Sequence, residues 1–306
     1  MVANPVDKDR SRSLVIHGTV VEPVRPEPAL YLVSTPIGNL GDITLRALEI
    51  LAACDLIACE DTRTTASLLS RYAITTPRIS YNEHNAAERG EALLSEISSG
   101  KSVALVSDAG TPLVSDPGGR LVEDAIEAGI SVVPVPGASA PLAALVASGF
   151  STTSFVFSGF LAAKKQARRN AFEAMRDHSE TGIFFESPKR LIACLEDMKD
   201  VLGPDRLVSV SREVTKLHET HYRGTIETVL SSIRALDRVR GEIVIVVDGA
   251  AKDGGAEIDL DGLLTDLLAH QSMRDAVAEA ASLTGKPRKE VYARALELRD
   301  KASLAG

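Results

Sequence analysis

The sequence contains no tryptophan, and aromatic residues make up only 4% of its 306 positions. The core must therefore be built from aliphatic side chains, and 44% hydrophobic with 25% charged residues is ordinary for a globular protein. Long apolar runs are also absent, because no stretch approaches the roughly 18 consecutive apolar residues of a membrane helix. A chain of this length predicts two domains, each large enough for its own core.

Cysteine is scarce, and Cys54, Cys59 and Cys194 are spaced for neither a zinc site nor a disulfide framework. The six histidines are scattered and no C-x-x-C pair occurs, so we predict no metal site. Residues 1–10 are not followed by the apolar segment of a secretory signal. Together these features favour a reducing, cytoplasmic location without a membrane anchor.

Positively charged residues are fewer than negatively charged ones, and the resulting net charge of −8 argues against a uniformly basic, nucleic-acid-binding surface. Local basic groups still occur, and single groups of this kind are more often solvated surface charge. The cations that we consider as candidate contacts for an anionic ligand are Arg63, Lys164, Lys165, Arg168, Arg169, Arg212 and Lys216.

The pattern of apolar residues divides the chain into four parts. Residues 1–28 are rich in proline and charge and predict a flexible leader. From 29 to 149, apolar runs alternate with helical patterns, which predicts a parallel sheet with right-handed crossovers. The expected strands are 30–33, 56–59, 78–80, 103–106 and 131–135, and the expected helices are 44–53, 64–71, 86–98, 119–128 and 139–149.

The pattern changes between 150 and 249, where two of the strand-like runs are separated by only eight residues. A helical crossover needs more residues than this, so we expect a hairpin and a mixed sheet. A linker at 250–257 then leads to a helical tail, 258–303, whose last two helices have helix-turn-helix spacing. Two interpretations of the tail stay open, a cap on the second domain and a nucleic-acid contact. The expected strands are 155–157, 182–185, 207–210, 219–224 and 242–247, and the tail helices are 260–269, 273–282 and 288–299.

The most informative motif is the turn at 33–42, V-S-T-P-I-G-N-L-G-D, which joins the first strand to a helix. This is where an α/β sheet admits a nucleotide-like ligand. The glycines follow G-x-x-G, and the pyrophosphate pattern G-x-G-x-x-G is missing. A Walker sequence is missing too, which argues against an NTPase. The turn therefore indicates a ligand that approaches the backbone closely but carries no pyrophosphate.

Two further turns of small residues also follow apolar strands. One holds Asp108, Gly110 and Thr111, and the other holds Ser139 and Ala140. The carboxyl ends of parallel strands lie at one edge of the sheet, so the three turns predict a single ligand crevice. The alternatives are that Asp108 only stabilises its turn and that Ser139 only caps a helix.

Polar clusters follow the remaining strands, at 60–65, 82–85, 186–190 and 211–216. His84 is the only histidine in the strand-end loops of the first domain, so it is a candidate general base. A polar cluster at the entry of a helix is an equally good interpretation of 82–85. The last two clusters pair cations with carboxylates, which suits phosphate binding or proton transfer. Surface ion pairs would give the same pattern.

Taken together, eight ordered motifs resemble a known family. They are LYLVSTPIGNLGDITLRALEIL, CEDTRTTASLL, NEHN, VALVSDAGTPLVSDPGGRLV, VPGASA, FFESPKRL, SREVTKLHE and GEIVIVVDG. The sequence is similar over 30–249 and the helical tail to the ribosomal RNA small subunit methyltransferase I family, the ribosomal branch of the tetrapyrrole-methylase-like superfamily. The resemblance implies an S-adenosylmethionine-dependent enzyme that methylates the 2′-oxygen of a cytidine in small-subunit (16S) ribosomal RNA. It also implies a homodimer and two α/β domains with the cofactor in the cleft between them. By position, the implied cofactor residues are Thr35, Pro36, Gly38, Asp108, Gly110, Thr111, Ser139, Ala140, Phe185 and Glu186.

For the chemistry, we expect Glu213 or His84 to accept the proton of the attacking hydroxyl. Lys216, Arg212 or Arg63 would then hold phosphate, and the basic group at 164–169 would make RNA binding salt-dependent. Two other functions stay open. One is methylation of a tetrapyrrole carbon, and the other is a catalytically silent ribosome-associated protein with the same fold.

Overall fold

The structure, a computed structural model, describes residues 12–116, 118–250, 259–284 and 286–304. They fall into two compact units, 1–249 and 250–306, which we call the N-terminal unit and the C-terminal unit.

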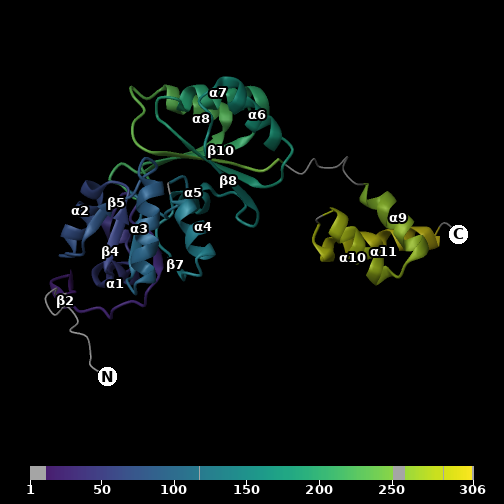
Figure 1. Ribbon diagram of the computed structural model, residues 1–306. Helices are drawn as coiled ribbons and strands as arrows, with labels where there is room; N and C mark the ends of the chain where they lie inside the picture. Colours follow the sequence, from purple (N-terminus) through teal and green to yellow (C-terminus); the bar gives the residue numbers. More distant parts are fainter. Residues whose placement is uncertain (1–11, 117, 251–258, 285, 305–306) are drawn as a thin grey trace. The chain divides into compact units, whose positions relative to one another are not determined.

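The N-terminal unit contains the predicted parallel sheet, whose strand order is β5-β4-β6-β3-β7. Figure 1 shows helices α1 to α4 around this sheet. Successive side chains of a strand point to opposite faces, so Leu30 and Tyr31 enter different cores. Both faces are covered, which is why strands such as β6 are buried at every position. The elements are β3 (Leu30–Val33), α1 (Leu45–Ala53), β4 (Leu56–Cys59), α2 (Thr62–Arg71), β5 (Arg78–Ser80), α3 (Ala86–Ser98), β6 (Val103–Val106), α4 (Gly119–Glu127) and β7 (Val132–Val135).

Part of the expected flexible leader is an ordered hairpin, so the prediction for 1–28 is wrong for 14–21. Strands β1 (Leu14–Ile16) and β2 (Thr19–Val21) pair antiparallel around His17 and Gly18, whose positive φ angles suit a two-residue hairpin turn. Leu14 is fully buried in the core of the parallel sheet. The amide of Val15 donates to the carbonyl of Tyr72 at 2.8 Å. Residues 1–11 of the expected leader lie outside the described residues.

The second sheet is mixed, as predicted, with order β11-β10-β12-β9-β8 and a β10–β11 hairpin. Only β8 and β9 pair in parallel. Helices α6, α7 and α8 cover one face (Figure 1). The elements are β8 (Phe155–Phe160), α6 (Lys165–Met175), β9 (Thr181–Glu186), α7 (Leu191–Leu202), β10 (Leu207–Arg212), β11 (Thr220–Thr225), α8 (Ile226–Arg234) and β12 (Ile243–Val247).

Helix α5 (Ala140–Ser148) comes from the first half of the chain but packs on the other face of the second sheet. Its residues Ala144 and Leu145 share a core with Ile183 of β9 and Val246 of β12. The loop at the start of α5 therefore lies where the two sheets of the N-terminal unit approach each other.

The C-terminal unit has its own small core. Helices α9 (Leu260–His270), α10 (Met273–Thr284) and α11 (Arg288–Leu304) match the predicted tail helices. The guanidinium of Arg294 pairs with Asp261 of α9. Residues 251–258 of the expected linker and Gly285 lie outside the described residues. The buried core residues are Leu264, Val277, Ala280, Val291 and Ala295.

Asp55 binds Arg12 and Arg25, which flank the N-terminal hairpin, and we predict that it makes stability depend on pH. Burial alone would raise the pKa of its carboxyl, but hydrogen bonds from Ser102, Arg12 and Arg25 lower it to about 2. Because the folded pKa lies below the unfolded one, the stabilisation is present at neutral pH and is lost as pH falls from about 4 to about 2. D55N should lower the unfolding free energy at pH 7 by about 2 kcal/mol.

Urea unfolding followed by circular dichroism at several pH values measures this effect. D124N is the control, because the Asp124 side chain is 41% exposed and its ion pair with Arg120 is long, at 3.7 Å. Parallel pH profiles for D55N and the wild type would contradict the prediction.

Candidate active site

The three glycine-containing turns predicted to share one crevice do meet in the structure. Thr35 and Gly110 exchange two backbone hydrogen bonds of 2.9 and 3.1 Å, which join the turn after β3 to the turn after β6. The hydroxyl of Thr111 donates to the carbonyl of Ala138 at 3.3 Å, which adds the turn after β7. These contacts fix one edge of the parallel sheet as a single polar rim.

A cavity of about 380 Å³ lies between this rim and the second sheet. Its volume is typical of a small-ligand site, and its wall combines apolar side chains with a few polar groups. The first half of the chain contributes Ile37, residues 109–111, residues 114–116 and the start of α5. The second half contributes Phe160, residues 185–188, Val214 and residues 241–244.

Six of the ten residues implied as cofactor ligands line this cavity. Thr35 and Pro36 are buried beside it in the turn that carries Ile37. Gly38 instead lines a separate hollow, and Asp108 is exposed and accepts a hydrogen bond from the amide of Asp61 at 3.1 Å. The six that line the cavity are Gly110, Thr111, Ser139, Ala140, Phe185 and Glu186.

The second sheet supplies an aromatic wall and a buried carboxylate. The ring of Phe185 contacts Phe157 and Phe160, with ring centroids 5.1 and 5.3 Å apart. Glu186 is only 2% exposed, and its Oε1 accepts from the amide of Ser187 and pairs with Arg190. Within the described chain its Oε2 has no hydrogen-bond partner, a costly arrangement that a ligand donor would relieve.

The loop before α4 carries a functional candidate that the sequence analysis missed. Leu113 and Ser115 have φ of 73° and 68°, and such backbone strain concentrates at functional sites. Asp116 lines the cavity, and burial raises the pKa of its carboxyl, as does the nearby Asp108, against a hydrogen bond from Ser107. In the sequence, the S-D-P-G-G stretch gave only the signal of an ordinary turn.

The two residues predicted as proton acceptors, His84 and Glu213, do not line the cavity. His84 is exposed in the loop before α3. The Glu213 carboxylate accepts from the amide of Glu242 at 2.9 Å and from Nζ of Lys216 at 3.0 Å, and these bonds lower its pKa. A carboxylate stabilised in this way is a weak base. The long-range partner of Glu213, the amide of Glu242, was not visible in the sequence.

The predicted RNA-contacting cations are mostly engaged with carboxylates. Arg168 is 5% exposed and forms a buried ion pair with Asp197 of α7, so the expectation that it contacts RNA is wrong. Arg169 pairs with Asp200 at 2.8 Å, and Lys165 lies 3.6 Å from Asp197.

The remaining predicted cations are placed differently. Lys164 is exposed just before α6. Arg63 is exposed and pairs with Asp61 at 2.6 Å. Arg212 is half-buried at the end of β10, and Lys216 pairs with Glu213 and Glu242.

The described residues hold no group of three or more histidine, cysteine or acidic residues placed to bind a metal ion. None of their helices has the length and apolar character needed to cross a membrane.

Comparison with solved structures defines the class of the fold. Diphthine synthase aligns with a TM-score of 0.58 at 16% identity, over 72% of this chain and 89% of that one. Cobalt precorrin-4 methyltransferase aligns with a TM-score of 0.57 and 17% sequence identity, over 72% of this chain and 95% of that one. Uroporphyrin-III C-methyltransferase from Thermus thermophilus was solved with S-adenosyl homocysteine. It aligns with a TM-score of 0.51 and 18% sequence identity, over 72% of this chain and 97% of that one. The profile of the Tetrapyrrole (Corrin/Porphyrin) Methylases matches residues 29–230, so the chain has the tetrapyrrole methylase fold and is an S-adenosylmethionine-dependent methyltransferase.

Sequence comparison narrows the class further. The protein called ribosomal RNA small subunit methyltransferase I in Mesorhizobium japonicum is 51% identical to this chain, and the alignment covers 91% of this chain and 95% of that one. The protein of the same name in Escherichia coli O157:H7 is 43% identical, over 88% of this chain and 94% of that one. The counterpart in Bacillus subtilis is 42% identical (86% and 93%). The profile of the RsmI C-terminal HTH domain matches residues 254–299. The chain belongs to the ribosomal RNA small subunit methyltransferase I family.

The shape of the cavity rim predicts a specific effect of G110A on cofactor binding. Gly110 has a φ of +81°, and an added Cβ would lie 3.1 Å from Ile37 Cγ2 at the cavity wall. Gly129 has a φ of +71° with nothing within 4 Å of an added Cβ, so G129A carries the strain alone. Both variants should lose about 1 kcal/mol of stability, and only G110A should also bind S-adenosylmethionine about tenfold more weakly, a loss of about 1.4 kcal/mol.

Titration calorimetry of the two purified variants separates the effects. Equal affinities for S-adenosylmethionine in G110A and G129A would show that the rim does not contact the cofactor.

Proposed function

We propose that this protein transfers the methyl group of S-adenosylmethionine to the 2′-oxygen of a cytidine in small-subunit ribosomal RNA, and that it acts in the cytoplasm. The observation that carries the proposal is the 51% identity to a protein called ribosomal RNA small subunit methyltransferase I over nearly the whole of both chains. The cavity supports it, because its rim has no pyrophosphate-binding glycine pattern and S-adenosylmethionine has no pyrophosphate.

The residues present fit that cofactor. Gly110 and Ala140 leave the backbone of the rim open to a ligand, and Phe185 offers an apolar wall. Glu186 has a buried oxygen without a partner among the described groups, which suits a hydroxyl or amino donor. S-adenosylmethionine supplies a methyl group on a sulfonium that is already a good leaving group. The contribution of the protein is therefore chiefly to align the acceptor oxygen with that methyl group and to exclude water.

The attacking hydroxyl loses its proton as the oxygen–carbon bond forms, and we propose Asp116 as the acceptor. Asp116 lines the cavity, whereas His84 and Glu213 do not. Its raised pKa makes it a stronger base than the ion-paired Glu213.

Nucleoside mass spectrometry of ribosomal RNA tests both proposals in one experiment. RNA from a strain lacking the protein should have lost one 2′-O-methylcytidine, and the wild-type gene should restore it. D116N should restore it about 100-fold more slowly while binding S-adenosylmethionine normally in calorimetry.

The outcomes separate the two claims. An unchanged nucleoside profile in the deletion strain would overturn the proposed reaction. Full and rapid restoration by D116N would leave the reaction standing and remove Asp116 from the role of base.

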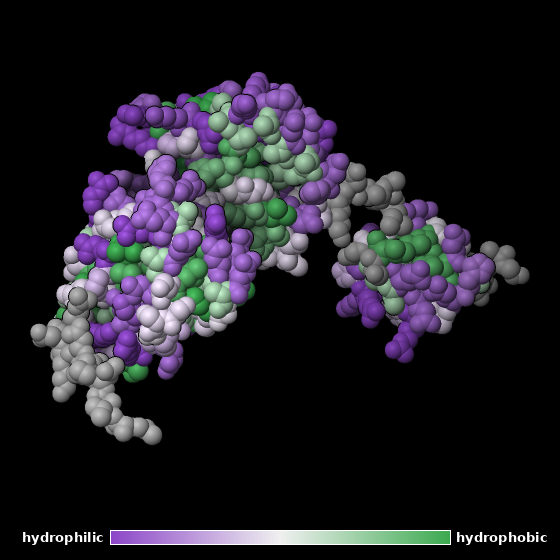
Figure 2. Space-filling view, in the orientation of Figure 1, coloured by the Kyte–Doolittle hydropathy of each residue, from purple (hydrophilic) through white to green (hydrophobic). Residues whose placement is uncertain are grey.

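We also propose that the protein is a homodimer, as the family resemblance implies. Apolar side chains are exposed along α5 and along β8, an edge strand of the second sheet, and Figure 2 shows such side chains over β8. Leu142 and Val146 of α5 are 49% and 73% exposed, and Phe160 of β8 is 62% exposed. Exposed apolar side chains of this kind favour a self-complementary interface with a second copy.

Light scattering coupled to gel filtration measures the assembly. The wild type should have twice the chain mass of 32.5 kDa, and V146E should shift toward the monomer. V24E is the matched control, because Val24 is 90% exposed before the parallel sheet begins. A monomeric wild type, or a V146E protein that dimerises as tightly as V24E, would contradict the proposal.

A further inference from the structure

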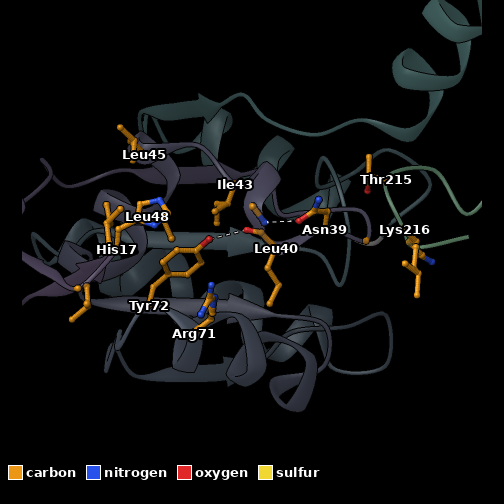
Figure 3. Close-up of a pocket in the computed structure, with 16 residues that line it drawn as sticks. His17, Asn39, Leu40, Ile43, Leu45, Leu48, Arg71, Tyr72, Thr215 and Lys216 are labelled. Atoms are coloured by element: carbon orange, nitrogen blue, oxygen red, sulfur yellow. Dashed lines mark hydrogen bonds between the residues drawn. The ribbon is translucent and has the colours of Figure 1, made fainter. Parts of the chain in front are cut away.

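A second and larger hollow, of about 1100 Å³, opens on the N-terminal unit (Figure 3). It is formed by segments far apart in the sequence, which are the hairpin tip at 15–18, the turn at 38–41, the start of α1, the end of α2 and the loop at 215–217. We propose that this hollow binds an unpaired nucleotide of the substrate RNA that flanks the methylated one. This inference rests on the proposed function and adds a substrate-binding site to it.

The hollow and the cofactor cavity share the chain segments that separate them. Ile37 lines the cavity, and the next residue, Gly38, lines the hollow. Val214 lines the cavity in the same way, and Thr215 and Lys216 line the hollow. Only these shared segments separate a nucleotide held in the hollow from the site of methyl transfer. A neighbour of the target nucleotide must lie at such a position.

That wall is close-packed and held by ion pairs. An added Cβ on Gly38 would overlap the side chain of Lys216, so a larger residue at position 38 would force that side chain to move. Nζ of Lys216 lies 3.0 Å from the Glu213 carboxylate and 3.1 Å from that of Glu242. The charge of Lys216 is therefore balanced within the protein, and its role here is to hold the wall in place.

The floor of the hollow suits a nucleobase. Figure 3 shows the ring of Tyr72 beside Leu40 and Ile43, with Arg71 next to it. The Tyr72 hydroxyl donates to the carbonyl of Leu40 at 2.8 Å, which holds the half-buried ring in position. Single-stranded RNA is recognised by stacking bases on such rings and by bonds to their edges. Asn39 accepts from the amide of Gly41 with its Oδ1, and this leaves its amide hydrogens for a base edge.

The charge at the hollow suits a phosphate. Arg71 ends α2 with an exposed side chain, and within the described part of the chain no carboxylate lies within ion-pair distance of it. This distinguishes it from Arg63 and Arg169, whose charges are already paired. A cation beside an aromatic ring at the mouth of an open hollow matches a nucleotide better than an apolar protein surface.

Methylation kinetics of R71E test the inference, with R89E as the matched control. Arg89 is likewise exposed, lies on α3, and has no carboxylate within ion-pair distance among the described residues. The substrate is small ribosomal subunits from cells that lack the protein. R71E should raise the KM for the subunits about tenfold and leave the affinity for S-adenosylmethionine unchanged. It should also lower the slope of log RNA affinity against log salt concentration by about one, the value expected for the loss of one phosphate contact. R89E should behave as the wild type.

Cross-linking provides a second readout that does not depend on a substitution. RNA containing 4-thiouridine next to the target should cross-link to peptides that contain His17 or Tyr72. R71E and R89E with equal KM and equal salt dependence would overturn the inference, as would cross-links confined to other parts of the chain. A wild-type protein that methylates no subunit RNA would instead refute the proposed function itself.

Discussion

The pair of backbone hydrogen bonds between Thr35 and Gly110 is the contact on which the site depends. Each strand of a parallel sheet ends in a loop that is free to diverge from its neighbours, and this pair ties two such loops together. It requires a residue with positive φ after β6, and Gly110 provides one without steric cost. Thr111 then extends the same rim to the third turn. Because the rim is made largely of backbone and small side chains, a ligand can approach it closely.

The second sheet turns that rim into a cavity. Helix α5 begins at the rim and buries one face against β9 and β12, so a single helix contributes to the wall and helps to hold the sheets together. On the far side of the turn at 36–41, Lys216 packs over Gly38 and pairs with two carboxylates. The cofactor cavity and the hollow at Tyr72 thus lie on opposite sides of one contact between the two halves of the N-terminal unit. In our proposals, one side holds the methyl donor and the other holds RNA.

The sequence alone was sufficient to predict those features of the fold and the site that depend on the local pattern of residues. Continuous apolar runs such as β6 gave the parallel strands, and small-residue turns at strand ends gave the shared crevice. The hairpin at His17 was missed because histidine is not a typical residue of a two-residue turn. Contacts between residues far apart in the sequence decided the other cases, since Arg168 forms a buried ion pair with Asp197 and the carboxylate of Glu213 accepts a hydrogen bond from the amide of Glu242. Asp116 was missed because a stretch with proline and glycine gives the same signal whether or not it faces a ligand. The cofactor and the reaction came from family resemblance alone.

The central claim is that the methyl donor binds between the two sheets, against the rim that Thr35 and Gly110 hold together. A crystal structure of the full chain with S-adenosylhomocysteine tests this most directly. The account predicts the ligand in the cavity of about 380 Å³, in contact with Gly110, Ser139 and Phe185. Ligand bound in the hollow at Tyr72, or anywhere else with that cavity empty, would contradict it.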